Sequence, residues 1–539
     1  MWALKPIDSE ERALALANEL KIHPALARVL YVRDIKTVEQ ANKFFNATLN
    51  DLYPYHALPD IDKAIERIIS AIKRKEKIVI WGHEDLDGIT SVVILYETIK
   101  ALQGQPMYHI PSKGKDKHGL SVEKAQEFAQ NGVKLIITVD CGITNLKEID
   151  EINKLGIDVI ITDHHEILDR LPNAIANIDP KRPDSPYPFQ FLAGCGIAFK
   201  LAVGLVDKCL NVNINELLAL KPDFLAYLAL GTISDRVPLV DENRILAKYG
   251  WQQFQKVKNP AILAILEISK INPSKMTYEQ FFSDIVPIFS SANGNLACEY
   301  FLHKDYQDCL NWVSELLAQS QAWQKEAREN LALAEEIADI TPGIIFVRDE
   351  RLSLRVLGHI AGKLKDRYQL PTLVLGYKNG DWVGECRGIN GVDLIALLKA
   401  HSNYFSAYGG HKKACGFTIA DKDVQKFIKS AKKYAKEHFV GNIISENKVA
   451  PEAILPLNEL KEDFLSLMPF GENNPTPILI SPNTTIISTN YRFILPERND
   501  LEIINNTEQS FNHDKINGNL LYTFNEQLVV SVLKIEKNN

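Results

Sequence analysis

The stretch from Lys77 to His165 alternates short apolar runs with amphipathic helical segments. The apolar runs are KIVIWG, PMYHIP, KLIITVD and DVIITDHH, and helical periodicity fills the intervals between them. Strands that alternate with helices predict βαβ units with right-handed crossovers and a mostly parallel sheet. The fold class expected for this part of the chain is therefore α/β. Residues 172–191, which are rich in proline and polar side chains, predict a surface loop after the last of these strands.

Three of the predicted strands end in acidic or imidazole side chains. They are Asp85 and Asp87 after the first run, Asp140 after the third, and Asp163, His164 and His165 after the fourth. The carboxyl ends of parallel strands share the edge of the sheet at which open α/β proteins bind ligands, so these groups can converge. Asp235 follows an apolar helix predicted at 224–233 and could return to the same edge.

These side chains offer oxygen and imidazole donors, which suit Mn²⁺ or Mg²⁺ better than a soft metal. Crowded carboxylates repel one another unless cations neutralise them. Two ions roughly 3.5–4 Å apart could activate a bridging water and stabilise the leaving oxygen of a phosphodiester. A simpler interpretation is open for each isolated aspartate, because an aspartate after a strand is often a turn residue or a helix cap. Two adjacent imidazoles at a strand end, in contrast, have no packing role.

The pattern outside this region predicts further domains. Residues 9–47 have helical periodicity, 310–338 predict a long connecting helix, a second α/β pattern begins after Pro342, and short strands with turns follow from about 450. We therefore predict an N-terminal helical cap (1–58), a catalytic domain (59–308), a connecting helix (309–340), a second α/β domain (341–445) and a small β-barrel (446–539).

Two further stretches carry candidate chemistry. The segment GGHKKACGF at 409–417 is either a tight turn between a helix and a strand or a loop that approaches a phosphate, with His411 and Arg387 as donors. The lysines at 429–436 favour a solvated helix face over a nucleic-acid patch. Aromatic side chains of the last domain could stack on single-stranded bases or belong to its core. They are Tyr491, Phe493, Tyr522 and Phe524.

Composition narrows the class of protein only a little. A chain of 539 residues suggests roughly three or four domains, and a net charge of −7 argues against binding nucleic acid by charge alone while allowing a local basic groove. The seven cysteines include no CxxC pair, which favours reduced thiols. We find no signal peptide and no membrane-spanning stretch, so a cytoplasmic protein without a membrane partner is expected.

Taken in order, the motifs HEDLDG, VDCG, TDHH and LGTISDRVPL followed by ENR resemble the four motifs of the DHH phosphoesterase superfamily. The segments LAGCGIAFKLA, GGHKKACGF and LMPFGENNPTP extend the resemblance, over nearly the whole chain, to the RecJ family of single-strand-specific 5′ to 3′ DNA exonucleases. The resemblance implies a catalytic DHH domain, a long connecting helix, a DHHA1 domain across a cleft, and a C-terminal OB-like β-barrel that helps to hold single-stranded DNA.

The resemblance also implies roles for individual residues. Two Mn²⁺ or Mg²⁺ ions would be bound, one by Asp85 and Asp140 and the other by Asp87, Asp140, His164 and Asp235, so that Asp140 bridges them. Asp163 would orient the neighbouring imidazole and His165 would face the scissile phosphate. The catalytic residues would therefore be Asp140, Asp163 and His165. The substrate-binding positions would be Lys113, Arg387, Gly409, Gly410 and His411.

Four positions depart from the expected family pattern. His83 stands where an aspartate is usual, although a metal-binding or supporting role remains open to it. Lys113 stands where an arginine would grip the terminal phosphate, and lysine lacks the bidentate fork. Glu385 replaces a phosphate-binding serine, and PIFSSANGN at 287–295 lacks an expected arginine. The set of metal ligands is therefore complete, whereas the phosphate-gripping positions are altered.

The expected function is that of a metal-dependent phosphodiesterase that degrades single-stranded DNA from the 5′ end to mononucleotides, in DNA repair or recombination. Single-stranded DNA is the expected partner, and a single-strand-binding protein or a helicase is a further candidate. Two alternatives stay open. The same site could act on short oligonucleotides or RNA, which Glu385 and the missing arginine favour, or the chain could be a non-catalytic scaffold in a replication or repair complex.

Overall fold

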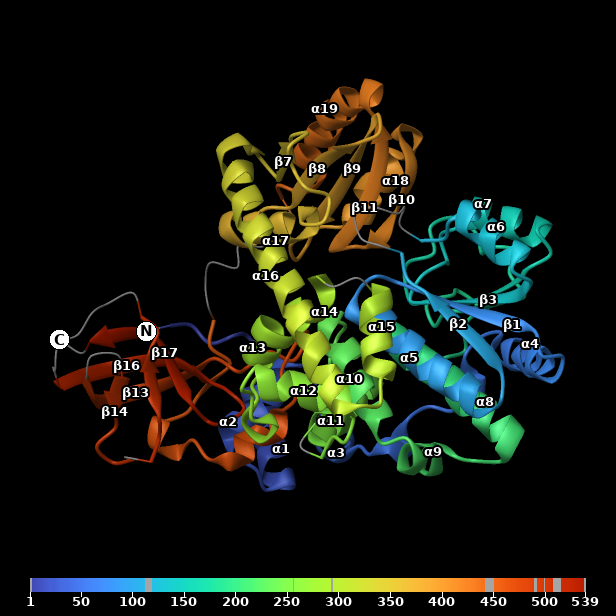
Figure 1. Cartoon of the computed structure of the whole chain (residues 1–539). Helices are drawn as coiled ribbons and strands as arrows, with labels where there is room; N and C mark the ends of the chain where they lie inside the picture. Colours follow the sequence, from blue (N-terminus) through green and yellow to red (C-terminus); the bar gives the residue numbers. More distant parts are fainter. Residues whose placement is uncertain are drawn as a thin grey trace.

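The computed structural model describes residues 2–111, 119–254, 256–291, 294–441, 450–488, 492–498, 500–507 and 515–537. Within them the chain forms three sheets with helices around and between them (Figure 1). The first sheet and its helices lie below the second, and a long helix runs between them, while the third sheet lies to one side (Figure 1). The α/β class and the C-terminal barrel predicted from the sequence are both confirmed.

The first sheet is entirely parallel, with strand order β2-β1-β3-β4-β5. Its strands are β1 (Lys77–Gly82), β2 (Gln105–His109), β3 (Val133–Val139), β4 (Asp158–Thr162) and β5 (Ala176–Ile178). The first four were predicted. The prediction of a plain surface loop at 172–191 was wrong in part, because β5 lies inside it; three residues are too few for a visible apolar pattern.

Helices cover both faces of this sheet, which is why its strands are apolar without alternation. In β1, Ile78 and Ile80 belong to the core beneath one face, whereas Val79 and Trp81 belong to the core beneath the other. The first face carries α4 (Ile61–Lys73), α5 (Leu86–Ala101) and α8 (Gly194–Leu210), and the second carries α6 (Val122–Gln130) and α7 (Leu146–Lys154).

A helical layer completes this first domain. It contains α9 (Ile214–Leu220), α10 (Asp223–Ser234), α11 (Asp241–Phe254), α12 (Pro260–Ile268), α13 (Tyr278–Gln280), α14 (Val286–Ser291) and α15 (Gly294–Leu302). The predicted connecting helix is α16 (Tyr306–Ile337). Its Val313 packs into the core of the first domain and its Ala334 into a core of the second, so one helix anchors both.

The second domain is a sheet of order β10-β11-β9-β8-β7-β6. Its elements are β6 (Asp339–Thr341), β7 (Ile344–Arg348), α17 (Leu357–Tyr368), β8 (Thr372–Lys378), β9 (Asp381–Arg387), α18 (Leu394–Ala400), β10 (Phe405–His411), β11 (Ala414–Ala420) and α19 (Asp421–His438). The glycine motif was predicted to lie in a loop or in a helix–strand turn, and both placements are wrong, whereas its role near a phosphate stays a prediction. The motif forms the β10–β11 hairpin, with Gly410 opposite Cys415, where the absence of a side chain at Gly410 lets the partner strand approach closely.

Five strands of the C-terminal domain close into a barrel, since β13 pairs with both β14 and β16. The strands of this sheet are β12 (Ala453–Ile454), β13 (Leu479–Ser488), β14 (Arg492–Ile494), β15 (Ile503–Asn505), β16 (Lys515–Phe524) and β17 (Val530–Lys537). Phe493, Tyr522 and Phe524 are at most 2% exposed, so their interpretation as base-stacking residues is wrong and they form the barrel core. Tyr491 lies outside the described residues.

The N-terminal helices belong to the same body as the barrel. They are α1 (Glu10–Leu20), α2 (Pro24–Val32) and α3 (Val38–Asn46). Leu26 and Leu30 of α2 share a hydrophobic core with Leu455 and Phe464, more than four hundred residues later in the chain. The domain boundaries given above remain a prediction.

Among the described residues, no single helix is long and apolar enough to cross a membrane. The helices α9 and α10, which are joined by a sharp bend, reach that length and apolarity only when they are counted together.

Candidate metal centre

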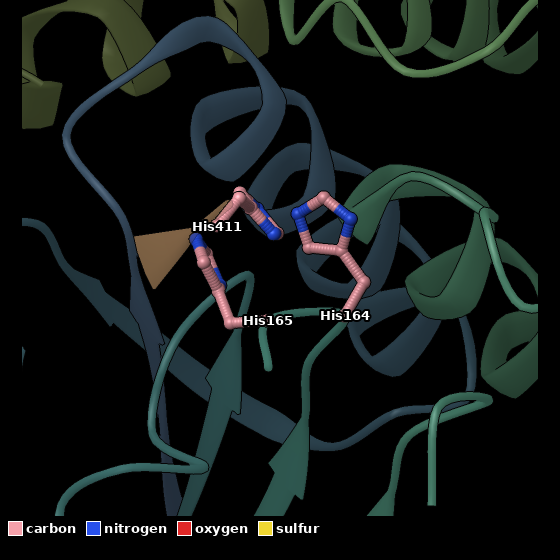
Figure 2. Close-up of side chains that lie close together, drawn as sticks. All are labelled: His164, His165 and His411. Carbon is pink, nitrogen blue, oxygen red and sulfur yellow. The ribbon is translucent and has the colours of Figure 1, made fainter. Parts of the chain in front are cut away.

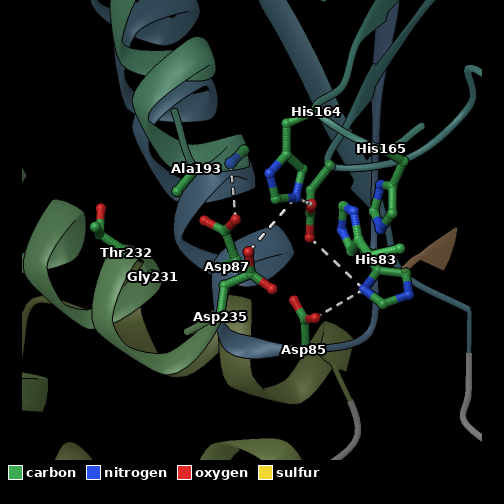
Figure 3. Close-up of polar contacts among 12 residues, drawn as sticks. His83, Asp85, Asp87, His164, His165, Ala193, Gly231, Thr232 and Asp235 are labelled. Carbon is green, nitrogen blue, oxygen red and sulfur yellow. Dashed lines mark hydrogen bonds and ion pairs between the residues drawn. The ribbon is translucent and has the colours of Figure 1, made fainter. Parts of the chain in front are cut away.

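The carboxyl ends of β1, β3 and β4 meet at one edge of the first sheet and bring the predicted side chains together (Figure 3). Asp140 has a φ of +59°, a conformation that aspartate tolerates better than most residues. Its N–H donates to the carbonyl of Thr162, which extends the β3–β4 pairing by one bond beyond the strands. The backbone therefore fixes the carboxylate of Asp140 between its neighbours.

One group of donors contains His83, Asp85 and Asp140. Their ligand atoms all lie within 4.8 Å of one another. His83 Nδ1 is 3.0 Å from Asp85 Oδ2 and 3.6 Å from Asp140 Oδ2. His83, whose role the sequence left open, thus lies in the cluster.

A second group contains Asp87, Asp140 and His164, whose ligand atoms also lie within 4.8 Å of one another. His164 Nε2 is 3.0 Å from Asp140 Oδ1 and 3.6 Å from Asp235 Oδ2. Asp140 therefore presents one carboxylate oxygen to each group. All three members of the second group are buried, with at most 1% of each residue exposed.

Backbone donors at the start of α8 hold Asp87 in place. The N–H groups of Gly194 and Cys195 donate to its two carboxylate oxygens, both at 2.8 Å. The positive end of a helix stabilises a carboxylate in this position. A side chain at Gly194 would come within 2.7 Å of Asp140, so only glycine fits there. The start of α8 was not predicted to be part of the site, although its sequence, LAGCG, belongs to one of the motifs that carry the family resemblance.

Burial and mutual repulsion change the acidity of the cluster. The pKa of Asp87 rises to about 6 because the carboxyl is buried and lies near the charge of Asp85. The pKa values of Asp140 and Asp235 rise well above the ordinary range, through burial and through the other aspartates. Burial alone would also raise the pKa of Asp85, but the adjacent His83 reverses this and lowers it.

The donors fit a divalent cation. Both carboxylate oxygens of Asp140 and Nε2 of His164 are buried and have no hydrogen bond of ordinary geometry within the described part of the chain. Burial, followed by the charge of His165, lowers the pKa of His164 and keeps its imidazole neutral, the form that binds metals. Carboxylate and imidazole donors with unmet demand are what Mn²⁺ and Mg²⁺ require.

Asp163 acts on the imidazole beside it. Its Oδ1 lies 2.7 Å from Nδ1 of His165 and accepts the N–H groups of His164 and His165 at 2.7 and 3.1 Å. Its Oδ2 accepts the N–H of Ile143 at 2.9 Å. Although burial raises the pKa of Asp163, His165 and these hydrogen bonds outweigh it and lower the pKa. A stable carboxylate at Nδ1 leaves Nε2 of His165 for other contacts.

The second domain meets the site through His411. Its ring stacks on that of His165, with centroids 4.5 Å apart and planes 17° apart, and lies 5.3 Å from that of His164 (Figure 2). Lys181 Nζ is 3.3 Å from Nδ1 of His411 and 3.5 Å from Glu166 Oε1. Burial and the charges of His165 and Lys181 lower the pKa of His411.

Lys181 and Asp179 are site residues that the sequence analysis missed. Asp179 is fully buried, and its Oδ1 accepts the N–H of Lys181 at 2.8 Å. Burial and the nearby Asp163 raise the pKa of Asp179 to about 8. Both residues follow β5, the strand that was predicted as loop. A polar pair directly after that strand would have been the signal.

The predicted phosphate-binding residues form a looser group than the metal donors do. Arg387 of β9 lies opposite Ala414 of β11, which in turn lies opposite His411 of β10, so one strand separates the two donors. Nη1 of Arg387 pairs with Oε2 of Glu385 at 3.0 Å. Gly409 and Gly410 lie in β10, and a side chain at Gly409 would point toward Thr144 of the first domain. Lys113 and the central residues 292–293 of PIFSSANGN lie outside the described residues.

Comparison with known proteins assigns the two α/β domains. Residues 77–232 match the family model of the DHH family, N-terminal domain, and residues 341–437 match that of the DHHA1 domain. The first α/β domain is therefore a DHH domain and the second is a DHHA1 domain. The chain is similar in sequence to RecJ proteins and shares their fold.

Three relatives illustrate the likeness. The single-stranded-DNA-specific exonuclease RecJ of Bacillus subtilis is 29% identical over 507 residues, which cover 90% of this chain and 62% of the relative. RecJ of Escherichia coli is 26% identical, covering 85% of this chain and 83% of that one. The crystal structure of RecJ from Thermus thermophilus in complex with Mn²⁺ superposes with a TM-score of 0.78 at 22% identity, over 100% of this chain and 80% of that chain.

Proposed function

We propose that the protein is a metal-dependent phosphodiesterase that degrades single-stranded DNA from its 5′ end to mononucleotides. The observation that carries the proposal is the sharing of Asp140 between two groups of metal donors, each completed by residues from other strand ends. The names of the relatives, which are single-stranded-DNA-specific exonucleases, support the choice of substrate. All the expected ligands lie together, which argues against the scaffold alternative.

The residues present would hold two Mn²⁺ or Mg²⁺ ions. His83, Asp85 and Asp140 would bind one, and Asp87, Asp140, His164 and Asp235 the other. When bound, such ions supply an activated water and neutralise charge on the scissile phosphate. The backbone N–H groups at the start of α8 donate to the carboxylate of Asp87. They hold Asp87 in place for metal binding without the help of another side chain.

The imidazoles of the two domains would bind the phosphate. Asp163 accepts at Nδ1 of His165 and keeps that ring in one orientation, so that Nε2 can contact a phosphate oxygen. The ammonium of Lys181 can only donate, so Nδ1 of His411 accepts and its Nε2 carries the proton. His411 is thereby a hydrogen-bond donor. Arg387, Gly409 and Gly410 would contact the strand from the same domain, with Lys113 on the side of the first domain.

Single-stranded DNA is the proposed partner, and a single-strand-binding protein or a helicase could deliver it. A role in DNA repair or recombination would place the enzyme in the cytoplasm with the chromosome.

The direct test uses strands labelled at the 5′ end. With Mn²⁺ present, we expect release of labelled mononucleotides from single strands and little release from blunt duplex. Asp140→Asn should be inactive, whereas Asp169→Asn, an exposed acid of the same strand-end loop, should be as active as the wild type. A bulky block at the 5′ end should stop degradation, and the same block at the 3′ end should not. Degradation from the 3′ end alone, or equal activity of Asp140→Asn, would refute the proposal.

One observation favours the alternative substrate, short oligonucleotides or RNA. The ion pair of Arg387 with Glu385 occupies the guanidinium that would otherwise grip a terminal phosphate. Rates on oligomers of about two to five nucleotides, compared with rates on long single strands of DNA and RNA, separate the two substrates. Faster turnover of the short oligomers would favour the alternative.

A further inference from the structure

A cavity lined by both charged and apolar side chains lies apart from the metal centre, where the two ends of the chain meet the first domain. Its volume is about 610 Å³, within the range of small-molecule sites. None of its lining residues belongs to the metal centre. The charged and aromatic lining residues that matter here are Arg33, Lys43, Phe44, Asp241, Arg244 and Lys248. They come from α3, from the end of α2 and from α11, whose segments lie together in Figure 1.

The charges of this cavity do not balance. Arg33 pairs with Glu452 at 3.1 Å, and Lys43 pairs with Asp241 at 2.9 Å. Arg244 donates only to backbone carbonyls, those of Phe44, Ser466 and Leu467, and it forms no ion pair in the described part of the chain. The ammonium of Lys248 likewise donates to the carbonyl of Phe45. Two positive charges therefore remain without a carboxylate among the described residues.

An excess of positive charge costs folding free energy when the charged group is buried. Arg244 is only 4% exposed, and its guanidinium lies 3.6 Å from the centroid of the Phe44 ring. An uncompensated buried charge destabilises a fold, and an anion supplied from outside would offset that cost. A phosphate fits because arginine and lysine are the side chains that bind it best.

Two further polar atoms of the lining are unsatisfied. Nε of Arg33 and Oδ1 of Asp241 are buried and make no hydrogen bond to any described residue. One is a donor and the other an acceptor, so a ligand that carries both an anionic group and a hydroxyl or amino group would satisfy both. Aromatic side chains add apolar faces, among them Phe191, which is 49% exposed.

We propose that this cavity binds a nucleotide unit, with its phosphate at Arg244 and Lys248 and its ring against the aromatic lining. The unit could be a free nucleoside monophosphate or a nucleotide of a DNA strand, and the two share the chemistry that the cavity recognises. The site is separate from the metal centre and does not require the proposed nuclease activity. Ligand binding would stabilise the joint between the ends of the chain and the first domain.

The test measures binding by calorimetry without divalent metal, in the full-length Asp140→Asn protein, so that no turnover occurs. The probes are dTMP, thymidine, inorganic phosphate and a short oligodeoxythymidylate. We expect dTMP to bind more tightly than thymidine or phosphate alone. Lys248→Ala should weaken dTMP binding by about tenfold or more, because a charge-assisted hydrogen bond is lost. Lys248→Arg should preserve it, and so should Lys256→Ala, an exposed lysine just after the same helix.

A second variant guards against a folding defect in the first. Phe191 is exposed, so Phe191→Ala should leave the melting temperature unchanged while it weakens dTMP and not inorganic phosphate. Binding of the oligomer in place of dTMP, with the same loss in Lys248→Ala, would identify a strand nucleotide as the ligand. Equal dTMP affinity in the parent, Lys248→Ala and Phe191→Ala, or no binding at millimolar dTMP, would overturn the proposal.

Discussion

The two domains that meet at His411 hold their charged groups in different ways. On the side of the first domain, backbone elements fix the carboxylates: strand ends carry Asp85 and Asp140, and the start of α8 holds Asp87. On the side of the second domain, side chains hold one another: Lys181 of the first domain contacts His411, and Glu385 pairs with Arg387. The first arrangement needs cations, whereas the second already has partners.

If the proposed function is right, the residues of the first side carry out the chemistry and those of the second side hold the substrate. Carboxylates that repel one another on a rigid frame have a strong demand for metal and little freedom to adapt. Side chains that are paired in the free protein must exchange those partners for a phosphate when a strand binds. We therefore expect substitutions on the first side to abolish turnover, and those on the second to change binding and substrate choice.

The largest effect should follow loss of the shared ligand. Asp140→Asn removes a donor from both groups, and because metal ions contribute several kcal/mol to stabilising charge in the transition state, activity should fall by about 10³-fold or more. Steady-state rates on single-stranded DNA in Mn²⁺ measure this. A residual rate within a few-fold of the wild type would mean that Asp140 does not hold both ions.

A smaller loss should follow release of His165. Asp163→Asn weakens the contact that orients this imidazole, and loss of such a supporting partner costs about 10–100-fold in activity. The loss should appear in kcat with little change in KM. If His165→Ala and Asp163→Asn together lose as much as the sum of the two single losses in free energy, the two residues act independently and the assigned role of Asp163 fails.

Metal affinity should rise with pH. The pKa of Asp87 is raised to about 6, so Asp87 holds a proton in the metal-free protein below that pH, and the raised pKa values of Asp140 and Asp235 favour protonation of these groups as well. Each proton that must leave makes affinity rise by about tenfold per pH unit below the pKa. Calorimetry with Mn²⁺ at about pH 5.5, 6.5 and 7.5 tests the trend. An affinity that is flat or falls with pH would contradict the raised pKa values.

The same shifts predict the stability of the metal-free fold. A carboxyl whose folded-state pKa exceeds its unfolded value favours folding while it is protonated, and this contribution is lost as pH rises through the folded pKa. The contribution of Asp87 should therefore lower the melting temperature of the metal-free protein as pH rises through about 6. Saturating Mn²⁺ should reverse that trend.

On the side of the second domain, Lys181→Ala should cost about tenfold, because a charge-assisted hydrogen bond is lost. The loss should lie mainly in KM, since Lys181 fixes the proton position of His411 and the orientation of a binding group. Lys181→Arg should recover part of it. A pure loss of kcat, without any change in KM, would place Lys181 in the chemical step instead.

The sequence predicted the first side of this comparison better than the second. Strand ends in a parallel sheet must converge, so Asp85, Asp87, Asp140 and His164 could be placed together from pattern alone. Lys181 was missed because the short β5 that positions it has no visible periodicity, so the polar residues after it were not recognised as a strand end. The hairpin around Gly410 was predicted as a loop or turn, since glycine-rich segments lack a strand pattern.

Contacts between distant parts of the chain were also beyond pattern analysis. Apolar positions in α2 predict a buried face but do not name its partner, which is the barrel. Alternation in the barrel strands shows that one face is buried, but closure decides which one, and it buried Phe493, Tyr522 and Phe524. The sequence showed that Glu385 is an unexpected acid at its position, but only the structure shows that it pairs with Arg387.

The smallest effect concerns that ion pair. Glu385→Ser frees Arg387 and removes a negative charge; a partly exposed pair of this kind contributes about 0–1 kcal/mol, so affinity for strands with a 5′-phosphate should rise by up to about fivefold. Competition binding with phosphorylated and unphosphorylated strands measures the change. An equal gain for both kinds of strand would show that Arg387 does not contact the terminal phosphate.

The most direct test of the shared-ligand site is anomalous diffraction from a crystal soaked in Mn²⁺, recorded near the manganese absorption edge. Two peaks are predicted, one among His83, Asp85 and Asp140 and the other among Asp87, Asp140 and His164, with Asp140 in contact with both. A crystal of Asp140→Asn should lose at least one of them. A single peak that Asp140 does not touch, or no peak at this edge of the sheet, would contradict the account.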